Sequence, residues 1–201
     1  MALRSYDFAL SGHAHRVRLF ASVLGLPLEL VPVDLGARAH KTPEYLAMNP
    51  LGQVPVLVDG DLTLSDSNAI LVYLALRYDP SGRWYPRDPA AAARIQRWLS
   101  VAAGELNAGP AAARRAAVFK APIDPEPLRA AAHRLLAVIE AQLGSTPYLA
   151  GDGPTIADLA IYTYTAHAPE GGVSLDGYPA IRAWLGRIEA LPGFVPMPRA
   201  G

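Results

Sequence analysis

The chain of 201 residues contains no cysteine. It can therefore form neither a disulfide framework nor a thiolate metal site. No side chain can form a mixed disulfide, so redox mechanisms that depend on a protein thiol are excluded. Any thiol chemistry must use a sulfur that a ligand brings.

The chain also lacks an excess of charge. Its 18 Lys and Arg residues balance its 18 Asp and Glu residues. A neutral chain has no general electrostatic attraction to nucleic acid or to an anionic membrane, so we expect neither as a partner. The apolar runs are too short to span a bilayer, and the first six residues lack the apolar centre of a signal peptide. We expect a cytoplasmic protein.

Hydrophobic residues are abundant, at 51%, so the chain can build a sizeable core. The patterns in its first part predict strand, helix, strand, helix, hairpin and helix. Pro32 indicates an edge strand, and Asp59-Gly60 is a tight-turn signal. The predicted strands are 3–8, 28–33, 54–58 and 62–64, and the predicted helices are 14–24, one that starts at Thr42, and 67–77. This order is the thioredoxin-like arrangement.

Clusters of proline, glycine and aspartate between residues 79 and 89 predict a linker. The sequence then becomes alanine-rich, and four apolar stripes predict helices around residues 95–106, 128–143, 155–166 and 181–188. Gly109-Pro110 predicts a bend or an end of the first of them. Thr155 and Asp158 have the spacing of a capping box. We therefore expect an α/β plus all-α protein, with a thioredoxin-like domain over 1–78, a linker over 79–89 and an all-helical domain over 90–201.

The most informative stretch is 49–57, together with the helix start that follows it. Pro55 lies near the start of an apolar run, where it cannot donate a strand hydrogen bond. A cis Val54–Pro55 bond suits a turn that holds the N–H and C=O of Val54 outward. Asp66 and Ser67 precede a helical pattern, which gives a polar helix start suited to an anion. These parts predict a site for a short, charged peptide.

This stretch resembles the glutathione-binding half of the cytosolic glutathione S-transferases. Ser11-Gly12-His13, followed by Val17-Arg18-Leu19, looks like the first loop and helix of that family. Thr155-Ile156-Ala157-Asp158 looks like the capping box of its C-terminal domain. The matches occur in the family's order over nearly the whole chain. The resemblance implies a homodimeric transferase of bacterial, serine type, with glutathione as co-substrate and no metal.

The resemblance also implies how glutathione is held. Val54, next to Pro55, can pair both backbone groups with the cysteinyl unit, as an added strand residue would. Ser67 can offer its N–H and hydroxyl to the γ-glutamyl carboxylate, Asp66 can take the ammonium, and Gln53 can contact the same end. Asp66 and Ser67 alternatively serve only as helix caps, which contribute about 1 kcal/mol.

Two further residues, His40 and Lys41, are candidates for the glycine carboxylate of glutathione. The sulfur itself needs a donor, because a free thiol titrates near about 8.5 and is mostly protonated at neutral pH. Ser11 matches the position of the catalytic serine, and His13 can donate to sulfur or act as a base. The alternatives are a capping serine and an exposed loop histidine. We expect His15 to be an exposed helix residue.

The resemblance predicts attack of the glutathione thiolate on a small electrophile. A glutathione-dependent disulfide reductase or peroxidase, and a non-catalytic interaction module of the same fold, remain alternatives. The helical half would hold the second substrate, and the tail 194–197 is a candidate to cover it. Candidate lining residues are Trp98, Glu105, Arg115, Phe119, Tyr162, Tyr164 and His167.

Overall fold

A computed structural model describes residues 3–200; Met1, Ala2 and Gly201, at the ends of the predicted domain ranges, lie outside the described residues. The N-terminal part holds one four-stranded sheet in the order β2-β1-β3-β4. Its strands are β1 (Leu3–Asp7), β2 (Leu28–Pro32), β3 (Val56–Asp59) and β4 (Leu62–Ser65). β1 pairs with β2 in parallel and with β3 antiparallel, and β3 and β4 form a hairpin. The predicted edge position of β2 is confirmed.

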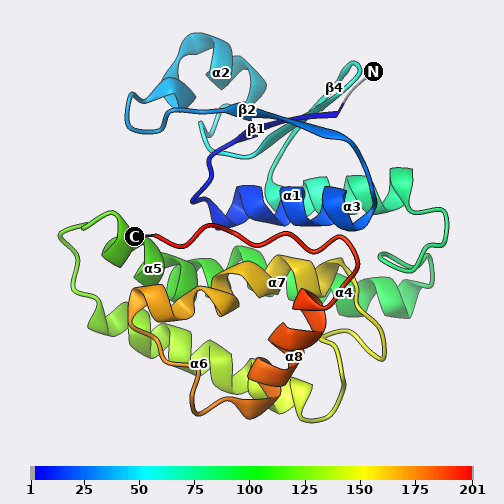
Figure 1. The fold of residues 1–201 in the computed structure, drawn as a ribbon, viewed down its shortest axis with the longest axis vertical. Helices are drawn as coiled ribbons and strands as arrows, with labels where there is room; N and C mark the ends of the chain where they lie inside the picture. The colour runs from blue at the N-terminus through cyan, green and yellow to red at the C-terminus, as the bar shows by residue number, and fades with distance from the viewer. Residues whose placement is uncertain (1–2, 201) are drawn as a thin grey trace.

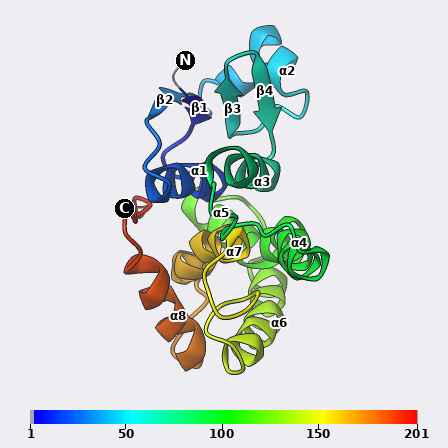
Figure 2. The same ribbon diagram turned by 90° about the vertical axis from the view of Figure 1, so that its right-hand side faces the viewer.

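The helices of this part lie on both faces of the sheet (Figures 1 and 2). α1 (Gly12–Val23) and α3 (Ser67–Tyr78) lie between the sheet and the helical part, and α2 (Pro43–Met48) lies on the far side. A 3₁₀ turn, η1 (Ala39–Lys41), precedes α2, and Thr42 caps α2 as expected. The predicted thioredoxin-like order is confirmed.

The regular structure of the C-terminal part is helical, apart from an isolated β-bridge between Tyr148 and Gly151. It comprises α4 (Pro89–Ala103), the π-helical turn η2 (Asn107–Ala111), α5 (Ala112–Val118), α6 (Glu126–Leu143), α7 (Ile156–Ala166), the 3₁₀ turn η3 (Ala168–Gly171) and α8 (Pro179–Glu189). Pro110 lies inside η2, and the chain continues from it into α5. Sequence reasoning missed α5 because its short run of alanines and arginines shows no apolar stripe.

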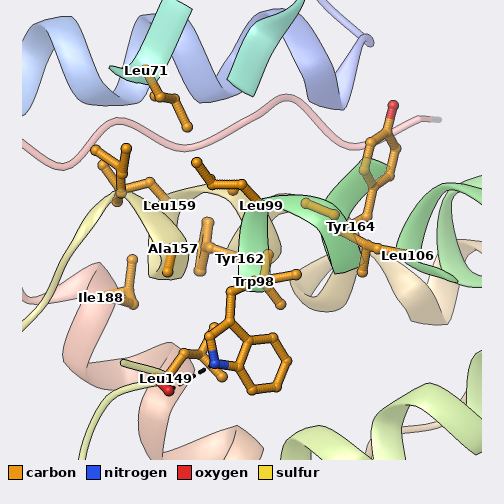
Figure 3. Close-up of a cluster of buried hydrophobic side chains, with 14 of the residues drawn as sticks. Leu71, Trp98, Leu99, Leu106, Leu149, Ala157, Leu159, Tyr162, Tyr164 and Ile188 are labelled. Atoms are coloured by element: carbon orange, nitrogen blue, oxygen red, sulfur yellow. Dashed lines mark hydrogen bonds between the residues drawn. The ribbon is translucent and has the colours of Figure 1, made fainter. Parts of the chain in front are cut away.

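The larger of two hydrophobic clusters within residues 3–200 joins the two parts. Leu71 of α3, Leu99 of α4 and Leu159 of α7 meet in it, and all three are buried (Figure 3). Trp98 is turned toward the interior of the helical part, where its Nε1–H donates to the Leu149 carbonyl at 2.8 Å. Within residues 3–200 no helix is long and apolar enough to cross a membrane.

The start of α7 is pinned inside this core by a capping box. Thr155 caps the helix, and Asp158 accepts from the Thr155 N–H at 2.9 Å. Asp158 also accepts from the Leu149 N–H and from Trp184 Nε1–H, at 2.9 and 3.0 Å. The capping box predicted from the sequence is confirmed, and it ties α7 to α8.

Candidate functional site

A cleft of about 470 Å³ opens between the sheet part and the helical part. Seven of the predicted site residues line it, namely His13, His40, Gln53, Val54, Pro55, Asp66 and Ser67. Ser11 and Lys41 are not among its lining residues. The other side chains that line it are Arg16, Leu35, Asn49, Leu51, Ser65, Asn68, Ala103, Asn107 and Arg115, with the backbone of Gly52.

The loop before β3 presents the backbone of Val54 to the cleft. The Val54–Pro55 peptide bond is cis, as the sequence predicted. The Gln53 carbonyl is occupied, because the Tyr45 hydroxyl and the Asn49 amide donate to it at 3.0 and 2.8 Å. Within the described part of the chain, the Val54 N–H and C=O have no protein partner. One extended residue of a ligand can therefore pair with them.

Gly52 lets this loop approach the residues before α2. Its φ is +57°, and a Cβ there would lie 2.7 Å from the His40 carbonyl oxygen. Lys41 Nζ donates to the carbonyls of Leu51 and Gly52, at 3.1 and 2.9 Å. Lys41 thus holds the loop in place, and His40 is the one of this pair that lines the cleft.

The start of α3 forms the next part of the wall. Asp66 has a φ of +71°, and its Oδ1 accepts from the N–H groups of Asn68 and Ala69, both at 2.9 Å. The second carboxylate oxygen accepts no hydrogen bond from residues 3–200, and the side chain is exposed. Ser67 follows and is 3% exposed. Asp66 is therefore a helix cap that keeps acceptor capacity at the cleft.

A buried cation lies beneath this helix start. Arg16 is 1% exposed, and its Nη1 donates to Ser67 Oγ at 3.0 Å and to Asn68 Oδ1 at 3.3 Å. Its guanidinium also lies 5.6 Å from the ring centre of Tyr164. Burial lowers the pKa of Arg16 to about 10, so it stays charged at neutral pH. No carboxylate within residues 3–200 pairs with it, so its charge acts on the cleft.

His13 lies at the first turn of α1, with its ring 5.1 Å from that of Tyr164. Arg16 Nη1 donates to His13 Nδ1 at 3.0 Å, so Nδ1 carries no proton and Nε2 is the N–H donor. Burial, followed by the charges of Arg16 and Arg115, lowers the pKa of His13 to about 3. His13 is therefore a neutral donor at the cleft and a poor base.

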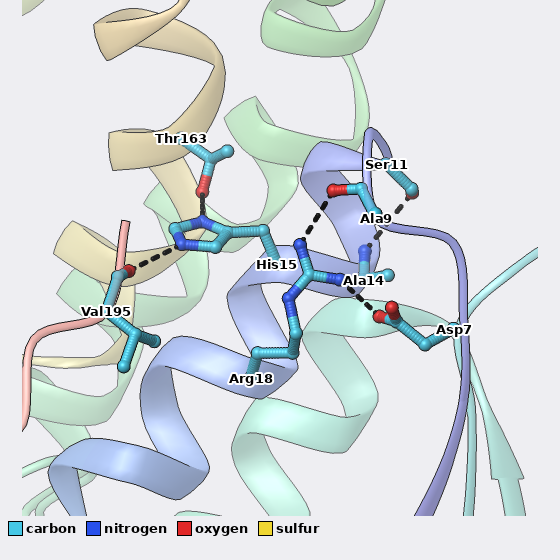
Figure 4. Close-up of polar contacts among 8 residues, drawn as sticks. All are labelled: Asp7, Ala9, Ser11, Ala14, His15, Arg18, Thr163 and Val195. Atoms are coloured by element: carbon cyan, nitrogen blue, oxygen red, sulfur yellow. Dashed lines mark hydrogen bonds and ion pairs between the residues drawn. The ribbon is translucent and has the colours of Figure 1, made fainter. Parts of the chain in front are cut away.

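Ser11 is the N-cap of α1, and its Oγ accepts from the Ala14 N–H at 3.2 Å (Figure 4). Its hydroxyl proton is not committed to any partner within residues 3–200. The capping alternative for Ser11 is thus realised, and a donor role toward sulfur stays a prediction.

The expectation that His15 is exposed was wrong. His15 is 0% exposed, with Nδ1 2.9 Å from Thr163 Oγ1 on α7 and Nε2 2.8 Å from the Val195 carbonyl (Figure 4). The hydrogen bond to the Val195 carbonyl holds the C-terminal tail along α1. Val195 lies in a groove beside β2 that is separate from the cleft. The tail therefore does not cover the cleft.

The helical wall contributes Ala103, Asn107 and Arg115. Arg115 Nη1 donates to Asn107 Oδ1 at 2.9 Å. Of the seven candidates for a second-substrate pocket, only Arg115 lines the cleft. Trp98, Tyr162, Tyr164 and His167 are buried instead, and Glu105 and Phe119 are exposed residues that are not part of its lining.

Sequence reasoning missed Arg16, Asn49, Asn68 and Asn107. Arg16 and Asn68 are buried, and Asn107 lies in the π-helical turn. A signal existed for Arg16, because a charged residue sits among apolar positions of a predicted buried helix face. No local signal marks Asn49 or Asn107, because their roles depend on the fold of distant segments.

The charge of the cleft suits an anion. Arg16 and Arg115 line it, and Asp66 is its one acidic lining residue. Within residues 3–200 no group of three His, Cys, Asp or Glu residues could hold a metal ion. The site therefore offers free backbone groups, a helix start, neutral donors and net positive charge.

Comparisons with known families agree with this geometry. Residues 1–76 match the family described as "Glutathione S-transferase, N-terminal domain", and residues 109–192 match "Glutathione S-transferase, C-terminal domain". The chain is 35% identical to glutathione S-transferase theta-2 of Homo sapiens, over 96% of this chain and 83% of that protein. It is 37% identical to glutathione S-transferase 3 of Zea mays, over 96% of this chain and 91% of that protein.

A solved structure described as a glutathione S-transferase from Pseudomonas fluorescens [Pf-5] superposes with a TM-score of 0.93. It is 34% identical, and the match covers 99% of this chain and 100% of that one. The cleft and these matches lead to the same assignment. The chain belongs to the glutathione S-transferase family and is an enzyme that uses glutathione as co-substrate.

Proposed function

We propose that the cleft holds glutathione with its cysteinyl unit paired to the backbone of Val54. The γ-glutamyl end then lies at the start of α3, where the ammonium meets Asp66 and the carboxylate meets the N–H and hydroxyl of Ser67, next to Gln53. The observation that carries this proposal is the unpaired Val54 backbone beside the α3 start, with the buried Arg16 charge beneath it. His40 is the candidate for the glycine carboxylate, and Lys41 acts through the loop that it holds.

The sulfur lies at the start of α1 in this proposal. The uncommitted hydroxyl proton of Ser11 donates to it, and Nε2–H of His13 is a second donor. Donors fixed before the reaction, and the positive end of the helix, favour the thiolate over the thiol. The thiol proton goes to solvent, because a histidine with a pKa of about 3 does not hold it. The thiolate then attacks the electrophile, and the leaving group departs with its electron pair.

Steady-state kinetics with a chloronitroaromatic acceptor test these roles. Ser11→Ala should lower kcat at neutral pH about 100-fold, the usual loss when one fixed donor to a developing anion is removed. Ser11→Thr keeps a hydroxyl and should retain most of kcat. His13→Ala should lower kcat about 10-fold, and His13→Gln, which keeps an N–H donor, should restore part of it.

Calorimetric titration with glutathione completes this test. All four variants should bind glutathione within about threefold of the wild type, because the proposed contacts act on sulfur. Full turnover in Ser11→Ala would contradict its role. Faster turnover of hydroxyethyl disulfide than of the aryl acceptor would instead favour the reductase alternative.

We also propose a homodimer in the cytoplasm with two domains divided at 79–89. Family membership supports the dimer, and exposed apolar side chains such as Leu51 (71%) and Leu76 (57%) offer surface for it. α3 ends at Tyr78 and α4 begins at Pro89, with neither helix nor strand between them. Sedimentation at the mass of one chain would contradict the dimer, and recovery in a membrane or secreted fraction would contradict the location.

A further inference from the structure

The helical wall of the cleft carries a cation that the proposed glutathione site does not use. Arg115 is exposed, lines the cleft and donates from Nη1 to Asn107 Oδ1 at 2.9 Å and from Nη2 to the Asn107 carbonyl at 3.4 Å. These neutral partners orient the guanidinium but do not neutralise it. Among the residues the structure describes, Arg115 forms no ion pair.

Two other cations near the cleft, Arg16 and Lys41, act at the proposed glutathione site. Arg16 is buried under the start of α3 and donates to Ser67 and Asn68. Lys41 donates to two loop carbonyls. The one carboxylate of the lining, Asp66, lies at the α3 start on the opposite, sheet-side wall. The guanidinium of Arg115 can therefore pair with an anionic group of a ligand at the helical wall of the cleft.

An aromatic surface adjoins this arginine. Phe119 caps the end of α5, four residues after Arg115, and its N–H donates to the Arg115 carbonyl at 3.0 Å. Phe119 is 52% exposed, and the centre of its ring lies 6.4 Å from that of Phe8, with an angle of 38° between the ring planes. Phe8 belongs to the loop that leads to Ser11, whose N–H donates to the Phe8 carbonyl. The two rings do not line the cleft, but they lie beside the loop that leads to Ser11.

We infer that the electrophile of this enzyme is an aromatic compound that carries an anionic substituent such as a carboxylate or sulfonate. The ring packs toward Phe8 and Phe119, and the anion pairs with Arg115. The sulfur of glutathione forms a bond to the ring carbon, and the bond from that carbon to a halide breaks, with the electron pair leaving on the halide. The inference rests on the proposed binding of glutathione in this cleft.

Two acceptors of nearly equal shape separate charge recognition from general catalysis. They are 4-chloro-3,5-dinitrobenzoate, which is anionic, and its carboxamide, which is neutral. Each kcat/KM is divided by the uncatalysed rate with free glutathione, which removes the difference in intrinsic reactivity. The wild type should favour the carboxylate, and Arg115→Gln should lower this preference about fivefold, the effect of one partly screened ion pair. Arg115→Lys should keep part of the preference.

Arg182→Gln is the matched control, because it removes an exposed arginine from α8 without touching the cleft. It should leave the preference unchanged. An equal preference in the wild type and in Arg115→Gln would overturn the inference. An equal fall for both acceptors would overturn it too, since Arg115 would then act on the thiolate.

Calorimetry keeps this test independent of turnover. Binding of the unreactive 3,5-dinitrobenzoate should weaken about fivefold in Arg115→Gln, whereas binding of 3,5-dinitrobenzamide should not change. Glutathione titrated into the wild type reports on the proposed function itself. Normal glutathione binding without a preference for the anionic compound would contradict this inference but not the proposed function. Absent glutathione binding would contradict the proposed function.

Discussion

An aspartate holds the start of α3 and another holds the start of α7, and of these two only the one at α3 faces the cleft. At the start of α3, Asp66 uses Oδ1 to hold the N–H groups of Asn68 and Ala69, and the side chain is exposed. At the start of α7, Asp158 is 0% exposed and both of its oxygens are occupied. The first therefore keeps acceptor capacity for a ligand, and the second has none left.

This contrast shows what turns a helix cap into a binding group. Both aspartates obey the same local rule, since each satisfies N–H groups that the helix leaves free. Asp158 also accepts from Leu149 N–H and from Trp184 Nε1–H, which come from other segments of the core. Asp66 meets open space instead, with a buried cation close by. The surroundings of the cap, and not the cap itself, decide between structure and binding.

The largest expected effect is a loss of stability when Asp158, the buried aspartate of the pair, is replaced. Asp158→Ala should lower the free energy of unfolding by about 4 kcal/mol, because it leaves several buried donors without acceptors. Urea denaturation followed by circular dichroism measures this loss. A loss below about 1 kcal/mol would show that the α7 start is as tolerant as an exposed cap.

A second test concerns the buried histidine that links α1 to α7 and to the tail. Burial lowers the pKa of His15 to about 4 from an ordinary 6.5, so the folded state disfavours its protonated form. Its stabilising effect is therefore complete above pH 6.5 and is lost as pH falls from 6.5 toward 4. The neighbouring cations Arg16 and Arg18, and His167, act in the same direction.

Comparing the free energy of unfolding of the wild type with that of His15→Gln isolates this effect. Glutamine does not titrate, and the pH dependence from all other groups is common to both proteins. The stability of the wild type relative to the variant should fall by roughly 3 kcal/mol between pH 7 and pH 4. Urea denaturation at several pH values measures it. A difference that is constant with pH would mean that His15 is not held neutral.

On the cleft side, Asp66→Ala should act mainly on binding. Loss of the contact to the ammonium should weaken the affinity for glutathione about 30-fold, or about 2 kcal/mol, while the lost cap costs about 1 kcal/mol of stability. Asp88→Ala is the matched control, because Asp88 caps α4 by accepting from the Ala91 N–H at 2.8 Å. It should cost similar stability and leave the glutathione affinity unchanged.

The smallest expected effects come from removing one hydroxyl at each helix start, that of Ser67 at α3 and that of Thr155 at α7. Ser67→Ala should weaken glutathione binding about fivefold, since the Ser67 N–H remains in place and only the hydroxyl is lost. Thr155→Ala should lower stability by about 1 kcal/mol with no change in glutathione affinity. Calorimetric titration and urea denaturation of both variants measure this pair. A reversed pattern would remove the distinction between the two caps.

The sheet-side wall could largely be predicted from the sequence. Val54, Pro55, Asp66 and Ser67 act through backbone geometry and caps, which depend on residues close to them in the chain. Both the cis bond and the order of strands and helices along the chain followed from local signals of this kind. Short-range rules are sufficient where the chemistry is made by neighbouring residues.

The helical wall and the buried charge could not be predicted in this way. Arg16 touches Asn68 across 52 residues, and Asn107 reaches the cleft only through tertiary packing. His15 was wrongly expected to be exposed, because nothing local shows that Thr163 and the tail would cover it. These residues act through contacts between segments that periodicity alone does not bring together.

The most direct test of the account is the ultraviolet titration of the thiolate of glutathione bound to the wild-type enzyme. The donors at the start of α1 and the Arg16 charge predict that the bound thiol titrates at least one pH unit below free glutathione measured in the same buffer. Bound glutathione whose thiol titrates at the free value would contradict the claim that this cleft generates the nucleophile.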